Sequence, residues 1–564
     1  MQRDATMNRL MTRVVAVAAC GVCATVVSFA QIGKITQQDW VTSGADAQRS
    51  SWIRGDAVIT PGSMQKPGFA LQWKTMLDNQ PRQLNSLRPG VVIGNLGFGS
   101  KPLSFVTGSA NRVFAVDNDT GVVFWQRTFE SGGGGAGTPQ CPGGITSAAT
   151  RPTTSVPTIP AWRGMQERPA YSSGVGAPGE GVPVYLMGRA GRAATAAPAA
   201  ATAAPAAATA AAPAPARAAG PAPAAAPAPP LPQVIYALSS DGQLHTLGPY
   251  SGKDLDRPVT FLPPNAHASD LIALNNVVYT TTMNGCGSVP DAVWALDLAA
   301  GSTAVKTWRT EGGSPAGAPA FANDGTVYVS LGARTTAGDG GYANAIVALD
   351  PRELAVKDWF TLPGVEFVTG PIVLNTGGRE IVAAATRDGS IVLLDARSLG
   401  GPTHGTALSR SVASSERTGF VPSGLTTWVD STGTPWVAMP TATTITAMKV
   451  ASVNGAPTLQ AGWTSRLMRA PLSPVIINGV AFVVSSGEYL PPAGATLSAA
   501  DRARQSVAAV LYALDAGTGR ELWSSGSTIT SFVHGPTVWP GIGQVHVAAF
   551  DNTVYAFGFP IERY

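Results

Sequence analysis

The chain has 564 residues, which is too long for one compact core of ordinary size, so several domains or one large repeat architecture is expected. Charged residues make up only 13% of it, and the formal net charge is +4, whereas an average protein has roughly 25% charged residues. Nucleic-acid-binding proteins and charge-driven disordered proteins both depend on dense charge, so this composition excludes both classes.

The N-terminus has the features of a secretory signal peptide, which we assign to residues 1–30. Arg9 and Arg13 precede an apolar run over residues 14–30, which ends in small residues that a signal peptidase could read. The run is shorter than the ~20 residues that a spanning helix needs, and no later segment is apolar enough, so no transmembrane segment is expected after signal removal. A periplasmic or secreted protein is therefore predicted, and an envelope lipoprotein processed at Cys20 is the alternative.

The first repeat follows an isolated strand that contains Trp73 and has no turn before it. This repeat has the form A-x-D-x-x-T-G-x-x-x-W, with Asp117, Gly121 and Trp125 at its key positions. A strand, a tight turn closed by Asp and Thr-Gly, and a second strand fit this pattern. Gly supplies a backbone angle that other residues resist, and Trp offers a large flat surface to cover the joint with a neighbouring unit.

The two cysteines of the mature chain, Cys141 and Cys286, predict one disulfide in an exported protein, with two buried free thiols as the alternative. Residues 189–232 lie between them and consist mostly of Ala, Pro and Thr. Proline at this density breaks helices, and nothing in the segment can build a core. We therefore predict a disordered Ala/Pro-rich insert.

A second intact repeat has Asp515, Gly519 and Trp523 at the same key positions, and degenerate copies lie between the two. The Ala position of the motif recurs eight times, at Ala115, Ala237, Ala295, Ala348, Leu393, Ala447, Ala513 and Ala556. The tighter spacings fall in the ~40–45 residue range of a four-stranded propeller blade. Upstream hairpin signals such as Asn478-Gly479 supply the other two strands of a blade. The sequence predicts an all-β, eight-bladed β-propeller with four-stranded antiparallel blades.

The last repeat lacks a Trp-bearing strand of its own, and the strand that contains Trp73 lacks a blade. Pairing this strand beside residues 554–559 would complete the last blade and close the ring, which leaves only short, protected sheet edges. The predicted organisation is a signal peptide at 1–30, an N-terminal lead-in at 31–70, and a propeller at 71–564 that is interrupted by the insert at 189–232.

The two intact motifs resemble the tryptophan-docking repeats of the quinoprotein (PQQ-dependent) alcohol dehydrogenase-like propellers. Residues 39–49 and 71–74 resemble the N-terminal lead-in of that family, and the resemblance spans residues 39–560. The same repeat also resembles that of an outer-membrane assembly lipoprotein with an eight-bladed propeller, which binds no quinone. The resemblance therefore implies the fold and leaves both a dehydrogenase and a scaffold open.

A dehydrogenase of this family would need PQQ, a divalent ion such as calcium and a carboxylate base. Familiar members also carry two adjacent cysteines beside the cofactor and often a Cys-x-x-Cys-His haem motif, and this sequence has neither. No set of Glu, Asn and Asp residues aligns with the calcium ligands of the family. We therefore assign no catalytic or metal-binding residue, and PQQ and calcium remain possible cofactors of the alternative function.

The longer connections are expected on one face of the ring, which we call the loop-rich face. They lie at residues 131–165, 188–232, 283–291, 332–344 and 487–506. Loops on a rigid scaffold commonly carry function, so this face is the candidate binding face. Cys141 and Cys286 both fall on it, which makes a disulfide between neighbouring loops reasonable.

Three polar residues precede predicted innermost strands and are candidates for a site at the mouth of the axis: Thr369, Arg469 and His534. They could bind an anion or a quinone, or they could satisfy the backbone near the axis. We predict an exported binding or assembly platform that takes a protein or small-molecule ligand, and no nucleic acid, at its loop-rich face. The alternative is a PQQ- and Ca-dependent alcohol or sugar dehydrogenase.

Overall fold

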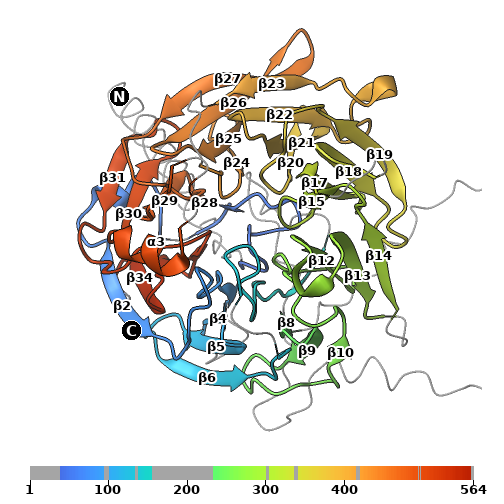
Figure 1. Cartoon of the computed structure of the whole chain (residues 1–564). Coiled ribbons are helices and arrows are strands. Elements are labelled where there is room, and N and C mark those ends of the chain that lie inside the picture. The colour runs from blue at the N-terminus through green and yellow to red at the C-terminus, as the bar shows by residue number, and fades with distance from the viewer. Residues whose placement is uncertain are drawn as a thin grey trace, which may run out of the picture.

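The computed structural model describes residues 39–154 and 233–560, apart from positions 57, 95–100, 134–136, 300–303, 336–340, 414–419, 493, 494 and 496. The described strands form eight sheets that are arranged in a ring around a central axis (Figure 1). The predicted eight-bladed, all-β propeller is therefore confirmed. The expected signal peptide at 1–30, with Cys20, and the insert at 189–232 lie outside the described residues.

Within each blade, consecutive strands pair antiparallel from the axis outwards. Blades 1 to 4 consist of β3 (Val91–Ile93), β4 (Leu103–Gly108), β5 (Arg112–Asp117) and β6 (Val123–Thr128); β8 (Ile235–Leu238), β9 (Gln243–Leu247) and β10 (Val259–Thr260); β11 (Ile272–Leu274), β12 (Val277–Thr282), β13 (Ala292–Asp297) and β14 (Val305–Arg309); and β15 (Gly313–Pro315), β16 (Ala320–Phe321), β17 (Val327–Arg334), β18 (Ala345–Leu349) and β19 (Val356–Thr361). In the described part of blade 2, Thr150 lies on the axis side of β8 and forms a single antiparallel bridge with Tyr236. The chain then continues into β7 (Pro152–Thr153), which pairs parallel with β11 of blade 3.

The other four blades are more regular. They consist of β20 (Ile372–Thr376), β21 (Arg379–Ala385), β22 (Ser390–Asp395) and β23 (Ser409–Val412); β24 (Thr426–Val429), β25 (Pro435–Pro440), β26 (Ile445–Val453) and β27 (Ala456–Thr464); β28 (Val475–Ile477), β29 (Val480–Ser485), β30 (Val510–Asp515) and β31 (Glu521–Ser524); and β32 (Val538–Pro540), β33 (Gln544–Ala548), β34 (Thr553–Gly558) and β2 (Ala70–Met76). Short helices η1 (Ser63–Gln65), η3 (Cys286–Ser288), η4 (Gly401–Thr403) and α3 (Ala499–Gln505) lie in the connections.

The middle strands are buried on both faces because each blade packs between two neighbours. Every residue of β4, β12 and β29 is buried, which explains why these strands read as runs of apolar and small residues. The outer strand β6 instead alternates between half-buried and exposed residues, the pattern of a strand with one solvated face.

The ring closes through the N-terminal strand, as the sequence predicts. β2 pairs antiparallel with β34, with Trp73 opposite Ala556. The Trp73 indole N–H donates to the Asn118 carbonyl in blade 1 at 2.7 Å, and its ring lies against Gly121, where an added Cβ would come within 2.4 Å of the indole. The last blade is thereby completed by the first strand and docked on the first blade.

The same docking explains the spacing of the repeat motif. Trp463 of blade 6 donates to the Ala516 carbonyl at 2.9 Å and covers Gly519, which has a φ of +72°. The glycine is therefore required twice, for its left-handed backbone and for the absence of a side chain beneath the indole. Trp523 of blade 7 packs against Phe69 instead, with ring centroids 4.9 Å apart. The last blade has no turn at this place, because its third strand, β34, and its fourth strand, β2, are separate segments of the chain.

Residues 39–56, which we call the axial segment, make a second closure inside the ring. The segment forms hydrogen bonds with the eight blades in numerical order. In blades 1 to 4, Trp40 O accepts from Val92 N, Val41 O accepts from Arg151 N, the Thr42 hydroxyl donates to Leu271 O, and Ala47 O accepts from Phe321 N. In blades 5 to 8, Gln48 O accepts from Val373 N, Ser50 O from Thr427 N, Ser51 O from Ile476 N, and the Asp56 carboxylate from Gly543 N. Its strand β1 (Trp52–Ile53) pairs parallel with β28. Figure 1 shows this blue segment crossing the centre of the ring.

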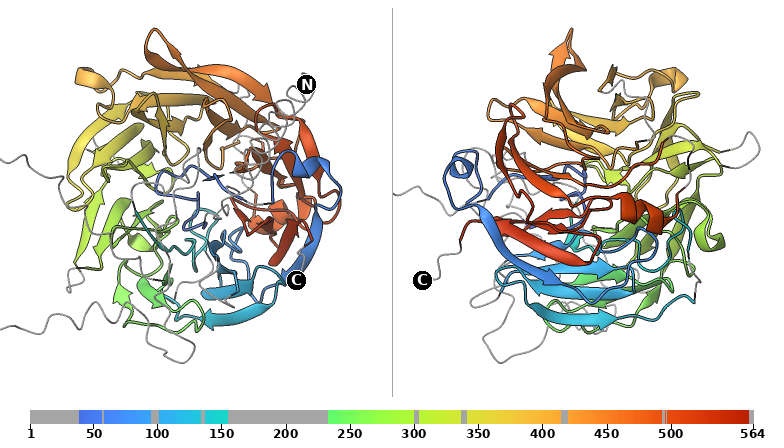
Figure 2. Two further views of the ribbon diagram at one scale, coloured as in Figure 1. Left: turned by 180° about the vertical axis from the view of Figure 1, so that it is seen from behind. Right: turned by 60° about the vertical axis from the view of Figure 1, so that its left-hand side comes forward.

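The two faces of the ring carry different connections. α3 and η3 join second to third strands on the loop-rich face, whereas first and second strands meet in tight turns on the opposite, short-turn face; the second view of Figure 2 shows α3 on one side of the ring and η1 on the other. The expected loop at residues 188–232 lies outside the described residues, so its place on the loop-rich face stays a prediction. The Thr153 carbonyl accepts from Asn275 N in the turn between β11 and β12 at 3.1 Å.

Candidate functional site

A cavity of about 290 Å³ surrounds the axis at the loop-rich face. Its walls come from residues that precede the innermost strands of successive blades, and its floor comes from the axial segment. The wall residues include Arg88, Thr146, His267, Asp270, Gly370, Ser423, Ser473 and Pro536, and the floor residues include Trp40, Gly44 and Arg49. A concave site with convergent polar groups is the default candidate for ligand binding.

An ion pair between Arg88 and Asp270 crosses one wall of the axial cavity. The guanidinium and the carboxylate are 2.9 Å apart, and Asp270 also accepts a hydrogen bond from the backbone N–H of Ala148 at 2.7 Å. Burial alone would raise the pKa of Asp270, but Arg88 and this backbone N–H outweigh burial and hold that pKa below its ordinary value. The carboxylate is therefore ionised and already engaged by donors.

Arg49 fastens the floor of the cavity to the surrounding blades. Its Nε donates to the Pro319 carbonyl at 3.0 Å and one Nη to the Asp270 carbonyl at 3.2 Å, while the other Nη donates to the Thr42 hydroxyl at 3.1 Å. Burial lowers the pKa of Arg49 to about 10, against the opposing effect of Asp270 and Asp46. Because backbone carbonyls take most of its donors, Arg49 chiefly positions the axial segment.

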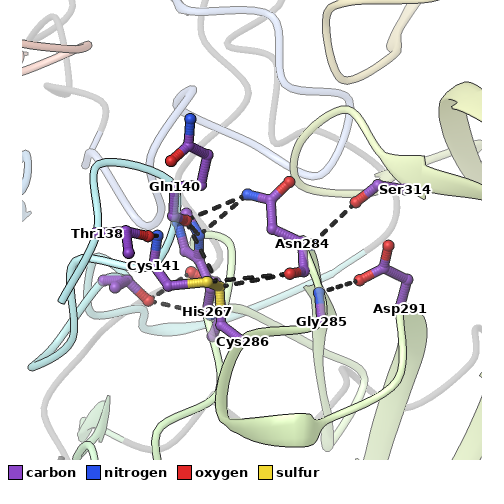
Figure 3. The surroundings of a disulfide bond; sticks show 11 residues. Thr138, Gln140, Cys141, His267, Asn284, Gly285, Cys286, Asp291 and Ser314 are labelled. Atoms are coloured by element: carbon purple, nitrogen blue, oxygen red, sulfur yellow. Dashed lines mark hydrogen bonds between the residues drawn. A yellow bond between two sulfur atoms is a disulfide. The ribbon is translucent and has the colours of Figure 1, made fainter. Parts of the chain in front are cut away.

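A disulfide joins two loops beside the mouth of the cavity. Cys141 and Cys286 are bonded, with their Cα atoms 5.5 Å apart, so the predicted pairing is confirmed. Next to them His267 Nδ1 lies 2.8 Å from the Gln140 carbonyl, and the Asn284 side-chain amide donates to the same carbonyl (Figure 3). Burial lowers the pKa of His267, although its contact with Gln140 opposes this shift. The loops of blades 2 and 3 therefore form one bonded unit at the cavity rim.

A second bonded unit on the loop-rich face contains two of the three residues predicted at the axis mouth. Glu488, which is buried, pairs with His534 at 2.8 Å and with Arg502 of α3 at 2.9 Å. The Arg469 guanidinium donates to the Gln505 carbonyl at the end of α3 at 3.1 Å. These contacts hold the connection between β29 and β30 against the chain that enters blade 8.

The third predicted residue, Thr369, is buried in blade 5, and its hydroxyl accepts from Ala385 N at 3.0 Å. The structure therefore brings Arg469 and His534 together through the α3 loop and leaves Thr369 apart from both. None of the three lines the axial cavity. Their part in binding a cofactor stays a prediction.

Sequence reasoning missed the charged residues that do line the cavity. Arg88 and Asp270 are 182 positions apart, so no local motif joins them. Arg88 precedes Pro89-Gly90, just as Thr369 precedes Gly370-Pro371, and this shared position before an innermost strand was the one available signal.

The axial cavity does not fit the calcium ion of a quinoprotein dehydrogenase. Calcium takes six to eight oxygen ligands, of which several are carboxylates. Among the described residues that line the cavity, Asp270 is the only carboxylate, and Arg88 and Ala148 already occupy it. No group of three His, Cys, Asp or Glu side chains in the described chain could hold a metal ion. The disulfide also joins two separate loops rather than adjacent residues.

The fold is an eight-bladed β-propeller, and loops on its loop-rich face are joined by a disulfide and by ion pairs. No protein-family profile matches the sequence, and no curated protein matches it. None of the helices in the described chain has the length and apolarity needed to cross a membrane.

Solved structures are similar at low sequence identity. A europium-containing methanol dehydrogenase matches 93% of this chain and 98% of that chain, with 12% identity and a TM-score of 0.53. The quinohemoprotein alcohol dehydrogenase ADHIIG from Pseudomonas putida HK5 matches 93% and 81%, with 12% identity and a TM-score of 0.52. BamB from Moraxella catarrhalis matches 87% and 100%, with 12% identity and a TM-score of 0.42. The chain thus shares the fold of the alcohol and methanol dehydrogenases.

Proposed function

We propose that the chain is an exported binding platform, periplasmic or secreted, which takes up a partner protein on its loop-rich face. The observation that carries the proposal is the bonding of this face into two units, one around the Cys141–Cys286 disulfide and one around Glu488. A preorganised surface loses little conformational entropy on binding, which favours affinity. A disulfide between loops also agrees with an oxidising compartment.

The donor set at the axis supports a platform over a dehydrogenase. A dehydrogenase of this fold needs free oxygen ligands for its ion and a free carboxylate base, whereas Asp270 is tied to Arg88 and Ala148. We therefore derive no redox step. The cavity supplies a polar recess in which Arg88 and Asp270 already compensate each other's charge, so it is suited to receive a polar group of a partner.

Site-specific photocrosslinking in the native cell envelope tests the platform. The crosslinker replaces the exposed residues Pro139 or Ala333 on the loop-rich face, and Thr432 or Thr518 on the short-turn face as matched controls. We expect a discrete crosslinked species from the first pair only. Equal crosslinking from both faces, or none from the loop-rich face, would contradict the proposal.

Reconstitution of the purified protein with PQQ and Ca²⁺ tests the alternative. Bound quinone with dye-linked alcohol oxidation would establish a dehydrogenase and overturn our assignment. A platform predicts neither a quinone absorbance change nor oxidation.

A further inference from the structure

Two aliphatic side chains on the loop-rich face are largely exposed and lie close to an arginine. Leu467, in the connection from blade 6 to blade 7, is 76% exposed, and Val507, which follows α3 in the connection between β29 and β30, is 49% exposed. Hydrogen bonds join the two connections, because the Arg469 carbonyl accepts from Gly487 N at 3.3 Å and the Gly487 carbonyl accepts from Val507 N at 2.9 Å. We call Leu467, Arg469, Tyr489 and Val507 together the Arg469 patch.

The arginine of this patch carries a charge that no carboxylate compensates. Arg469 is exposed and forms no ion pair within the described chain. Its three neighbouring arginines are each paired with a carboxylate: Arg466 with Glu521, Arg502 with Glu488 at 2.9 Å, and Arg504 with Asp501. This part of the loop-rich face is therefore left with one uncompensated positive charge, which lies on Arg469.

Although Arg469 is exposed, its side chain is held in place. The guanidinium donates to the Gln505 carbonyl at the end of α3 at 3.1 Å, and its Cζ lies 6.0 Å from the centroid of the Tyr489 ring. The Arg469 backbone N–H donates to the Ser485 hydroxyl at 2.9 Å. A guanidinium has five N–H donors, so most of them stay available, and an anion that binds them orders little further rotamer freedom.

The combination of a free arginine and exposed aliphatic side chains is typical of a protein-binding hot spot. Arginine often carries a large share of the binding energy at an interface, and the contacts around it exclude water. When a partner covers Leu467 and Val507, an ion pair to Arg469 is shielded from solvent and becomes stronger than a pair on an open surface. The uncompensated positive charge disfavours a basic partner and favours an acidic one.

We propose that the Arg469 patch binds a carboxylate side chain of the partner protein, in a segment where apolar residues flank the acidic one. The carboxylate accepts from the available N–H donors of Arg469, and the flanking apolar side chains contact Leu467 and Val507. This inference rests on the proposed platform function and names the chemistry by which the platform recognises its partner.

Three pentapeptides test this chemistry directly on the full chain. Their sequences are Ser-Leu-Glu-Leu-Ser, Ser-Leu-Gln-Leu-Ser and Ser-Ser-Glu-Ser-Ser, and both ends are blocked so that no terminal charge contributes. Dissociation constants are measured by saturation-transfer NMR at low salt. We expect the first peptide to bind best, and the second and third each to bind about five- to tenfold more weakly, because the second lacks the charge and the third lacks the apolar contacts.

Two pairs of variants locate the site. Arg469→Gln should weaken the first peptide about five- to tenfold and leave the second within about twofold, whereas the matched Arg504→Gln, which removes an arginine that is already paired, should leave both within about twofold. Leu467→Ser should weaken both leucine peptides about threefold. The matched Val453→Ser, at an exposed position of β26 on the short-turn face, should change neither.

A preference for the first peptide that is lost in Arg469→Gln but kept in Arg504→Gln supports the patch. Equal binding of the first two peptides, or equal losses in these two variants, overturns the role of Arg469, and equal effects of Leu467→Ser and Val453→Ser overturn the apolar part.

The peptides and the photocrosslinks separate this inference from the platform function. If no peptide binds saturably, the patch is overturned even when crosslinks from Pro139 and Ala333 support the platform. If the peptides bind as expected and neither position crosslinks, the chemistry of the patch is supported and the platform is contradicted.

Discussion

His546 is a buried base whose replacement should change how stability depends on pH. It lies in β33 with its ring between Trp539 and Trp73, at centroid distances of 5.4 and 5.3 Å. The side chain is fully buried, and neither ring nitrogen has a hydrogen-bond partner among the described residues. Burial lowers the pKa of His546 from 6.5 to about 3.

The magnitude follows from this difference in pKa between the folded and unfolded chain. The unfolded chain takes up the proton near pH 6.5, but the folded chain does so only near pH 3. The contribution of the neutral imidazole is fully present above pH 6.5 and is lost as pH falls, by about 1.4 kcal/mol for each pH unit. Between about pH 7.5 and about pH 4.5 the free energy of unfolding should therefore fall by about 3 kcal/mol through this residue.

His546→Leu removes this titration and leaves an apolar side chain of similar size. At about pH 7.5 we expect the free energy of unfolding of the variant to lie within about 1 kcal/mol of the wild-type value, because the removal of two unpaired nitrogens offsets the poorer fit of Leu between the indole rings. At about pH 4.5 the variant should be the more stable protein by about 3 kcal/mol.

Urea unfolding followed by tryptophan fluorescence at several pH values measures the effect. All other titrating groups are common to both proteins, so the difference between their unfolding free energies isolates His546. The reasoning is refuted if the two proteins show parallel pH dependence, or if NMR detects protonation of this imidazole near pH 6.

Two further predictions concern the closures. Trp73→Ala should lower the free energy of unfolding by about 4 kcal/mol. Gly121→Ala should be clearly destabilising alone and less destabilising beside Trp73→Ala, because the indole that its Cβ would strike is gone, while the cost of its φ of +71° and of the contact with the Thr75 hydroxyl remains. Additive effects in a double-mutant cycle would contradict the docking. Replacing both Cys141 and Cys286 by Ser opens a loop of 145 residues and should cost up to about 5 kcal/mol, read as a lower thermal midpoint that a reductant reproduces in the wild type only.

The ring could be predicted because its key interactions repeat with local sequence signatures. The spacing from Asp117 to Trp125 encodes a turn and a docking strand, and the glycine in it faces the indole of the preceding blade. The closing strand could be inferred by elimination, since Trp73 had no blade and the last blade lacked a Trp. The disulfide followed from compartment and from the sidedness of the loops.

Other features depend on contacts that no local pattern records. The path of the axial segment depends on backbone hydrogen bonds, which carry no residue preference. β7 has two residues, too few for an alternation to show, so the sequence did not predict this strand. Arg88 and Asp270 are 182 positions apart in the sequence. Which of the residues before the innermost strands line the cavity depends on how the blades are arranged in the closed ring.

Both closures join segments that lie far apart in the sequence. One hydrogen bond, from Gln72 Nε2 to the Gly558 carbonyl, spans 486 positions, and such non-local pairing is slow to form. Before β34 has been made, the blades can pair only as an open arc, because β2 has no partner strand until then. The ring is therefore expected to close late in folding, after its individual blades have formed.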